Sequence, residues 1–497
     1  IASSGKFNFI SRLPYTNSLS ATSCSNDLNE HNNDIFVSMS SKTLTLNGGF
    51  REKKDILPYL NIAKDKMITS KKGYFSNIGF TNRKNLEFVL MGFQNSESFF
   101  NSLNHEKINF DENNLIVKVN QWNPFTGRIS IYGSYEEKNG LNYFQTDSLY
   151  HDDDCGSLGF LLEKDLYNFL FTFSSSSSLI NSNWTIGQRD LEFRRQNSSF
   201  NSSAKVLFNK HNTELYIKNL KMVFSKSRTS DVPNPVSDIS MQPGYWDNQG
   251  FNISTEIVKP NTERDQSYYF SFGQTYNIPN IQGTILHQVD FSPFNQQKEI
   301  YPEKLSKMEL KMLISDDYLK YDWSYNFKLS LFQNSIKDKI IYLNYLGNPT
   351  LFPVNIGNTS INGLQFYIEL EPKVKKVRLS SSLVVYSSSD FSKFLFLPKH
   401  SLKNILHINN RYFKLTFIST HHGLQNVNYI NQSNQIDSEV YNSQTDYSLQ
   451  LSKVISFKNS DATFSFISHN INNSRLIFNQ VNFRPRSFEM ICGINLN

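Results

Sequence analysis

Apolar and polar side chains alternate along much of the chain. Between residues 321 and 331, the odd-numbered positions carry Tyr, Trp, Tyr, Phe, Leu and Leu, and the even-numbered positions carry Asp, Ser, Asn, Lys and Ser. The same period of two recurs at 307–314, 364–371 and 487–496. Successive side chains of a β-strand point to opposite faces, so this period predicts strands with one apolar and one polar face.

Roughly two dozen such segments follow one another, many near the ~10 residues that a membrane-spanning strand needs. Helical periodicity is scarce, and we expect one short helix within residues 55–71. Short turns alternate with longer polar loops. We expect the turns at 82–84, 164–166, 210–212, Pro372 and 458–460, and the loops at 14–33, 52–73, 136–154, 226–247, 387–403 and 421–445.

This alternation is typical of a transmembrane antiparallel β-barrel with short periplasmic turns and long extracellular loops. At about 22–23 residues per strand and connection, the chain fits an all-β barrel of about 22 strands. We expect residues 1–497 to form a single outer-membrane β-barrel domain.

Closure of the barrel explains why the chain stops on an apolar strand. Lipid offers no partner for backbone N–H and C=O groups, so strands can cross a membrane only in a closed sheet. The last strand then pairs with the first, and no edge is left exposed. Its outer face would carry Phe488, Met490, Cys492, Ile494 and Leu496.

The polar face of each strand would line the lumen. Glu369 and Glu371 precede the Pro372 turn, and Lys376 and Arg378 follow it. On one hairpin these charges can pair across the strands.

Composition supports a sheet that is apolar on one face only. Of the 497 residues, 38% are hydrophobic, 14% are aromatic and 19% are charged. The net charge of +6 is spread along the chain without a basic stripe, which argues against nucleic-acid binding. We interpret the aromatic residues as lipid-facing surface and interfacial girdles.

The three cysteines, Cys24, Cys155 and Cys492, fit no metal-binding spacing. A Cys24–Cys155 disulfide is possible if both residues lie in outer loops. Cys492 is most simply a small apolar residue of the last strand. The sequence contains no run of 18 apolar residues that would predict a transmembrane helix, and no signal peptide is visible.

Three stretches of the C-terminal third resemble the barrel of TonB-dependent outer-membrane receptors. In 355–371, Asn355, Gly357 and Gly363 match the family's Asn-x-Gly…Gly start of a strand. The segment 397–408 is similar to its Pro-x-His strand start, and 467–496 is similar to its closing segment. The resemblance implies energised uptake of a scarce nutrient, such as an iron chelate, a cobalamin-like cofactor or a glycan.

Two features depart from that family. Its members usually carry an N-terminal plug domain and a TonB-contacting box, and we recognise neither. Barrel-like strands are expected from residues 6–13 onward, which leaves no segment for a plug. The chain also ends on Leu496 and Asn497, where these barrels commonly end on an aromatic residue.

Few residues suggest chemistry. Asp152, Asp153 and Asp154 in His-Asp-Asp-Asp-Cys could hold Ca²⁺, although we favour a solvated loop because the spacing of a calcium loop is absent. His421 and His422 could bind metal or touch a ferric ligand, although a polar loop tip is favoured; His400 and His407 are interpreted as structural.

No nucleophile, zinc-protease or phosphate-loop motif is present, so we do not expect an enzyme. No catalytic, cofactor-binding or metal-binding residue is assigned, no cofactor is expected, and the ligand-binding residues remain open. The expected partners are outer-membrane lipid and lipopolysaccharide, with either a plug and TonB or outer-membrane lipoproteins.

Two other functional classes remain open. One is a plugless scaffold barrel in an outer-membrane complex. The other is a secreted, soluble β-rich adhesin or lectin-like protein.

Overall fold

The fold is that of a computed structural model. It describes residues 18–496 except for 27–29, 42, 59–65, 83–85, 102–105, 124–125, 145–146, 187–188, 209–214, 234–243, 261–264, 280–299, 317–322, 345–350, 373–375, 395–396, 431–435, 474–476, 479–480 and 483–485. The strand expected at 6–13 and the turn expected at 210–212 lie outside the described residues.

Twenty-two strands form one sheet. They are β1 (Ser18–Asn26), β2 (His31–Ser40), β3 (Leu44–Pro58), β4 (Lys66–Asn82), β5 (Leu86–Asn101), β6 (Glu106–Asn123), β7 (Gly127–Phe144), β8 (Asp147–Leu166), β9 (Phe169–Ile186), β10 (Arg189–Leu207), β11 (Tyr216–Pro233), β12 (Gly244–Pro260), β13 (Asp265–Asn277), β14 (Glu303–Asp316), β15 (Trp323–Lys337), β18 (Thr359–Pro372), β19 (Val377–Ser388), β20 (His400–Asn409), β21 (Lys414–His422), β24 (Gln444–Ser456), β25 (Ser460–His469) and β28 (Ser487–Leu496).

Shorter elements lie in the connections of the second half. They are the hairpins β16 (Ile340–Asn344) with β17 (Leu351–Asn355), β22 (Gln425–Ile430) with β23 (Ile436–Tyr441) and β26 (Ile477–Phe478) with β27 (Val481–Asn482), and the 3-10 turn η1 (Phe391–Lys393).

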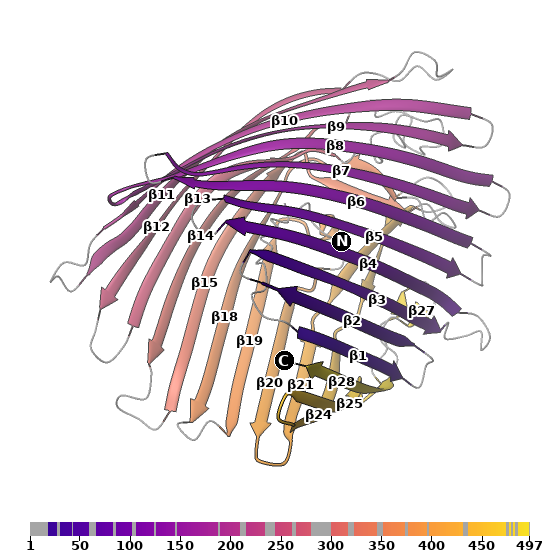
Figure 1. The fold of residues 1–497 in the computed structure, drawn as a ribbon, viewed down its shortest axis with the longest axis vertical. Coiled ribbons are helices and arrows are strands. Elements are labelled where there is room, and N and C mark those ends of the chain that lie inside the picture. The colour runs from indigo at the N-terminus through magenta and orange to yellow at the C-terminus, as the bar shows by residue number, and fades with distance from the viewer. Residues whose placement is uncertain are drawn as a thin grey trace.

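The sheet is closed. β1 pairs with β2 on one side and with β28 on the other, where Leu19 lies opposite Leu496 and Asn26 lies opposite Glu489. Figure 1 shows β28 beside β1, next to the C-terminal end of the chain. The predictions of an all-β barrel of about 22 strands, and of a last strand that pairs with the first, are confirmed.

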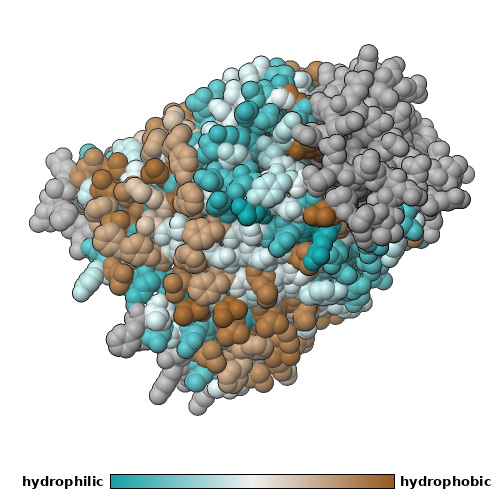
Figure 2. Space-filling model, turned by 90° about the horizontal axis from the view of Figure 1, so that it is seen from above, coloured by the Kyte–Doolittle hydropathy of each residue, from teal (hydrophilic) through white to brown (hydrophobic). Residues whose placement is uncertain are grey.

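In the strands that show the period of two, the apolar positions gather on one face. On β28, Phe488, Met490 and Ile494 are exposed by 41%, 60% and 56%, and on β14, Met308 and Leu310 are exposed by 46% and 49%. In a closed sheet this exposed apolar face is the outer one, which would meet lipid, and the alternate positions face the lumen. Figure 2 shows hydrophobic side chains gathered over part of one face of the molecule, apart from a hydrophilic area.

One wall of the barrel is much taller than the other. β8 has 20 residues and β10 has 19, whereas β21 has 9. Figure 1 shows the long strands β4–β10 side by side. Short turns join β2 to β3, β4 to β5 and the later pairs of the same kind, and they all lie at one end of the barrel. We call this end the turn end. The opposite end is called the loop end.

Several segments that the sequence predicts as loops are strands of the barrel wall. Residues 14–33, 52–73 and 136–154 are largely strand where the structure describes them, and 226–247 and 421–445 contain strand as well. Residues 14–33 and 136–154 are rich in polar side chains, and 52–73 mixes apolar and polar residues irregularly, so these segments lack the alternation that indicates a strand. Ladder hydrogen bonds to both neighbours hold them extended, because each backbone group gains a partner there. In 387–403 a loop around η1 is confirmed.

The helix expected within 55–71 is wrong for residues 55–58 and 66–71, which are strand, and 59–65 lie outside the described residues. Asp55 pairs with Thr69 and Ile56 with Ile68 in the ladder between β3 and β4. Both strands continue ladders that start deep in the barrel, so tertiary pairing overrides the local helical pattern. No helix among the described residues is long and apolar enough to cross a membrane.

Most of the predicted turns are in place. β4 ends at Asn82, β18 ends at Pro372, and 457–459 separates β24 from β25. The turn expected at 164–166 is wrong by two residues, since β8 runs to Leu166 and the turn is Tyr167 and Asn168. Tyr167 adopts a positive φ of 53°, which the sequence does not predict because a positive φ is uncommon for residues other than glycine.

Candidate functional site

Charged and amide side chains gather on the inner face of β5, β6 and β7 toward the loop end. Lys138 Nζ lies 2.6 Å from Glu136 Oε1 and 3.8 Å from Glu112 Oε1. Asn114 and Asn95 donate hydrogen bonds of 2.9 and 3.3 Å to Glu112. We call these five residues the inner-rim cluster. Its side chains are partly exposed to the lumen, so they are available to a polar solute.

The two carboxylates of the inner-rim cluster differ electrostatically. The outer face at this height is polar, with Asp154 opposite Glu137 on the neighbouring strand, so the cluster lies beyond the apolar band. Burial, and then the hydrogen bond that the protonated Glu136 carboxyl donates to Glu112, raise the pKa of Glu136. The pKa of Glu112 is lowered because hydrogen bonds from its neighbours outweigh its burial.

Hydroxyl and amide groups continue this inner surface across β7–β10. Ser134 Oγ lies 2.6 Å from Ser157 Oγ, and Ser176 Oγ lies 2.6 Å from Ser199 Oγ. Asn197 donates a 3.2 Å hydrogen bond to Ser178. The sequence pattern does not single out these residues. The runs of Ser and Asn at 174–178 and 197–203 were the available signal, but low apolar content alone does not indicate a strand.

The His-Asp-Asp-Asp-Cys segment lies within β8 and not in a loop, which corrects its interpretation. The His151 ring is buried and stacks on Trp184 with centroids 5.0 Å apart. Ser182 accepts a 2.6 Å hydrogen bond from Trp184 and donates one to Asp153. Burial lowers the pKa of His151. Asp152 points to the opposite face from Asp153, so the three carboxylates do not converge on one cation.

A buried ion pair joins the next strands of the tall wall. Arg195 Nε donates a 2.6 Å hydrogen bond to Asp231 Oδ1, and Arg195 Nη2 donates a 2.5 Å hydrogen bond to Asp231 Oδ2. Nη1 donates 2.8 Å to the carbonyl of Pro279, and the guanidinium lies 5.5 Å from the Trp246 ring centroid. The Arg195 pair therefore ties β10, β11 and β12 to the start of the connection after β13.

The histidines do not sit on a loop tip. His421 and His422 are the last residues of β21 and point to opposite faces, because β21 pairs with β20 and β24 up to its end. His421 contacts His400, with 3.2 Å between the two Nε2 atoms, while His422 Nδ1 lies 3.4 Å from Ser401 Oγ. His407 Nδ1 lies 2.9 Å from Thr416 Oγ1 within the ladder.

The cysteines are free thiols. Cys24 is on β1 and Cys155 is on β8, several strands apart in the sheet, so they are not bridged. Cys24 Sγ donates a 2.5 Å hydrogen bond to Glu489 Oε1, and His469 Nε2 lies 2.8 Å from Glu489 Oε2. These contacts join β1, β28 and β25 across the closure. Cys492 is exposed on the outer face, as predicted for a small apolar residue.

The charges beside the Pro372 turn pair across β18 and β19. Arg378 Nη2 donates to both carboxylate oxygens of Glu369 at 2.9 Å, and Tyr367 also donates to Glu369. The predicted cross-strand pairing is confirmed for these two charged residues.

Several inner-face polar atoms toward the turn end have no hydrogen-bond partner within the described part of the chain. They are Asn47 Oδ1, Asn77 Oδ1, Asn120 Oδ1 and Ser130 Oγ. They lie on β3, β4, β6 and β7. Buried polar atoms are normally satisfied, so these are positioned to bind water or a polypeptide in the lumen.

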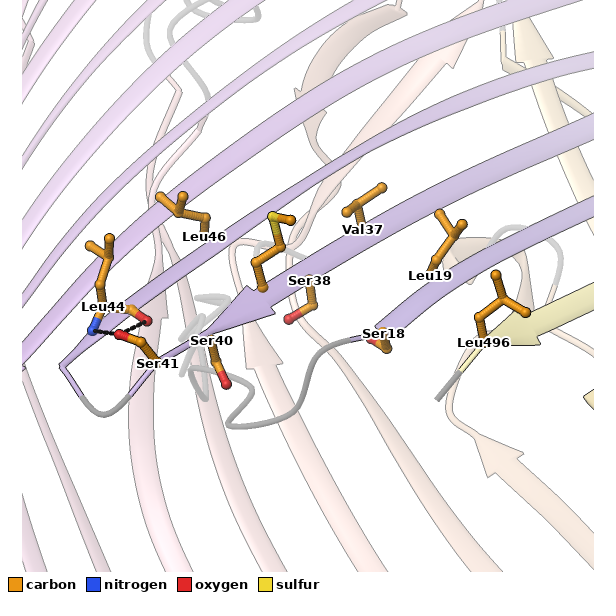
Figure 3. A pocket seen from close by; sticks show the side chains of 10 residues that line it. Ser18, Leu19, Val37, Ser38, Ser40, Ser41, Leu44, Leu46 and Leu496 are labelled. Carbon is orange, nitrogen blue, oxygen red and sulfur yellow. Dashed lines mark hydrogen bonds between the residues drawn. The ribbon is translucent and has the colours of Figure 1, made fainter. Parts of the chain in front are cut away.

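An apolar groove of about 540 Å³ lies on the outer face where the first and last strands meet. Figure 3 shows Leu19, Val37 and Leu496 lining it from β1, β2 and β28, with Leu44 and Leu46 of β3 beside them. The Ser41 hydroxyl is bonded back to the Leu44 backbone at 3.0 and 3.2 Å. The groove therefore presents mainly methyl groups.

Among the described residues, no three His, Cys, Asp or Glu side chains are grouped so that they could hold a metal ion. The inner face offers hydrogen-bond donors, acceptors and charged side chains, several of them in ion pairs. These groups can bind and guide a polar solute.

The stretches that carry the family resemblance start barrel strands. Asn355 donates to the carbonyls of Tyr301 and Asp338 at 3.0 and 2.8 Å and accepts from the Tyr301 N–H at 2.8 Å. Gly357 has a φ of +76°. A side chain on Gly363 would meet the Phe332 ring at 2.1 Å. These residues thus fix the turn into β18.

No protein-family model and no curated protein matches the chain. Solved structures match it at low identity. The copper transporter OprC is 10% identical, with a TM-score of 0.75, and the match covers 97% of this chain and 80% of that one. The siderophore receptor PiuA from Acinetobacter baumannii is 9% identical, with a TM-score of 0.70 over 97% of this chain and 82% of that one. The ferric citrate transporter FecA is 9% identical, with a TM-score of 0.69, and the match covers 98% of this chain and 79% of that one.

At this identity the matches establish the fold. They agree with the three stretches that resemble TonB-dependent receptors and with the closed sheet of 22 strands. The chain therefore has the barrel fold of the TonB-dependent outer-membrane receptors.

Proposed function

We propose that this chain is the barrel of an outer-membrane receptor that takes up a scarce nutrient. The observation that carries the proposal is the closed sheet of 22 strands, since barrels of this size have a lumen wide enough for a nutrient and a plug. Solved structures with this fold include proteins described as a copper transporter, a siderophore receptor and a ferric citrate transporter.

The inner surface supports transport of a polar solute. The inner-rim cluster presents carboxylates and Lys138 toward the loop end, and the hydroxyl surface of β7–β10 continues from it. The amide oxygens of Asn47, Asn77 and Asn120, which have no hydrogen-bond partner among the described residues, support a polypeptide plug toward the turn end. We infer a binding and transport role without catalysis.

The outer surface supports residence in the outer membrane. Exposed apolar side chains cover the outer face of the described strands, and the groove at the closure is wide enough for an acyl chain. Lipid and lipopolysaccharide are the partners that fit this face. We propose that residues 1–497 act as one barrel domain and that a plug and TonB complete the receptor.

The test is gene deletion in the natural host, followed by growth with iron or copper held limiting by chelators. We expect a growth defect under one limitation that the wild-type gene restores, and that is also seen when TonB is depleted. Uptake of the corresponding labelled chelate should fall in parallel.

Unchanged growth and uptake under every limitation, together with stable copurification of outer-membrane lipoproteins, would favour a scaffold barrel instead. A protein that stays in solution without detergent would contradict the membrane assignment as well.

A further inference from the structure

The His400–His421 pair lies on the outer face of the barrel, at the loop end of β20 and β21. The register places His421 opposite Leu402, so both imidazoles share the face of Leu402 and Leu406. The two Nε2 atoms are 3.2 Å apart, and the rings are 5.2 Å apart between centroids, inclined by 24°. Both side chains are partly exposed.

This separation is what a single metal ion imposes on two imidazoles. Zinc and copper bind imidazole nitrogen at about 2.0–2.1 Å, so two nitrogens on one ion are about 2.9 Å apart at a right angle and about 3.4 Å apart at a tetrahedral angle. The observed 3.2 Å falls between these limits. The ion needs little movement of either strand.

Both rings are also held in orientation. His421 Nδ1 lies 2.8 Å from Thr445 Oγ1 on β24. A hydrogen bond from Nδ1 leaves the lone pair on Nε2, which is the usual arrangement of a metal-binding histidine. The His400 ring lies over Gly423, where a Cβ would come within 2.7 Å of the ring.

We propose that His400 and His421 bind one divalent transition-metal ion through their Nε2 atoms. Imidazole favours Cu²⁺, Ni²⁺ and Zn²⁺ over Mg²⁺ and Ca²⁺. Two protein ligands leave coordination positions open to water or to a ligand from outside. The ion would join β20 and β21, and through Thr445 also β24, beside the connection that carries β22 and β23. The site does not depend on the proposed uptake function.

The test uses the full chain in detergent, purified with a tag that contains no histidine and stripped with a chelator. Cu²⁺ is titrated by calorimetry and by electron paramagnetic resonance. We expect one ion per chain, with nitrogen hyperfine structure from two imidazoles. Either His400→Ala or His421→Ala should weaken binding at least about tenfold. His407→Ala is the matched control, because this histidine also contacts a threonine but faces the lumen without a second imidazole.

A second variant guards against misfolding. Thr445→Val keeps both histidines and removes the Nδ1 partner, so it should weaken Cu²⁺ binding by about tenfold while the heat-modifiable migration of the barrel stays unchanged. Equal binding by wild type and the His400→Ala/His421→Ala double variant overturns the proposal, as does a spectrum without nitrogen coupling. In that case the two rings form an ordinary imidazole hydrogen bond.

Discussion

The Arg195–Asp231 pair offers the sharpest test of how the inner wall is held together. Asp231 is fully buried and the Arg195 side chain is 6% exposed. Asp231→Asn keeps the shape of the side chain and removes its charge, so the buried guanidinium of Arg195 loses this carboxylate. Breaking such a pair destabilises a protein by about 3–5 kcal/mol. Two charge-assisted hydrogen bonds of 2.6 and 2.5 Å are weakened at the same time.

An exposed pair on the same wall is the matched control. Asp247 lies 3.4 Å from Arg228 and 3.5 Å from Lys226 on the outer face, and its side chain is 31% exposed. Exposed pairs contribute about 0–1 kcal/mol, so Asp247→Asn should have little effect.

Replacing both buried partners should be milder than replacing one. Burial raises the pKa of the Asp231 carboxyl more than Arg195 lowers it, so the ion pair does not fully offset its own desolvation. Arg195→Met with Asp231→Leu removes both charges and should cost less than Asp231→Asn alone.

The assay is urea unfolding of the barrel in lipid vesicles, followed by tryptophan fluorescence, because Trp246 reports directly on this site. The free energy of unfolding should fall by about 3–5 kcal/mol in Asp231→Asn and by less than about 1 kcal/mol in Asp247→Asn. Equal effects of the two substitutions would refute the reasoning.

Three further predictions concern the inner-rim cluster, the aromatic stack and the lipid-facing surface. Because the folded-state pKa of Glu136 is raised, the folded protein binds a proton more readily than the unfolded one, so wild-type stability should rise as pH falls from neutral through that pKa. Glu136→Gln should flatten this dependence in urea titrations at several pH values, and an unchanged slope would contradict it. Gly140→Val should lower the free energy of unfolding by about 1–3 kcal/mol and shift the tryptophan emission, because a Cβ at this position would lie 1.8 Å from the His151 ring. Unchanged emission and stability would argue against the stack of His151 on Trp184. In vesicles, Leu310→Arg on the outer face should lower the free energy of unfolding by about 2–4 kcal/mol. Lys311→Ala on the inner face should lower it by about 1 kcal/mol or less. A larger loss for Lys311→Ala than for Leu310→Arg would mean that the two faces are assigned the wrong way round.

The period of two predicts strands correctly where one face of a strand is apolar. Phe488, Met490 and Ile494 on the closing strand, and Met308 and Leu310 on β14, are exposed on the outer face as predicted. Where the strands rise beyond that band, both faces are polar and the period of two disappears. Segments such as 136–154 therefore resembled loops although the ladder continues through them.

Contacts between the candidate site residues depend on how the strands pair. The sequence identified His421 and His422 as neighbours, but neighbours on a strand point apart, and the partner of His421 is His400 on the adjacent strand. The Ca²⁺ site considered for the acidic run at 152–154 and the possible Cys24–Cys155 disulfide do not form. Strand alternation separates the carboxylates, and the order of the strands in the sheet separates the cysteines.

The class of the fold follows from local patterns, because a period of two and the spacing of turns are properties that each strand carries independently. The same period also determines which side of each membrane-spanning strand is apolar. Which side chains meet depends on the assembled sheet, as in Arg195 with Asp231, Glu112 with Glu136 and Lys138, and His400 with His421. Those contacts depend on the register between strands. That register is set by the closure of the whole sheet and by side chains on both neighbours, so no single segment of the sequence contains it.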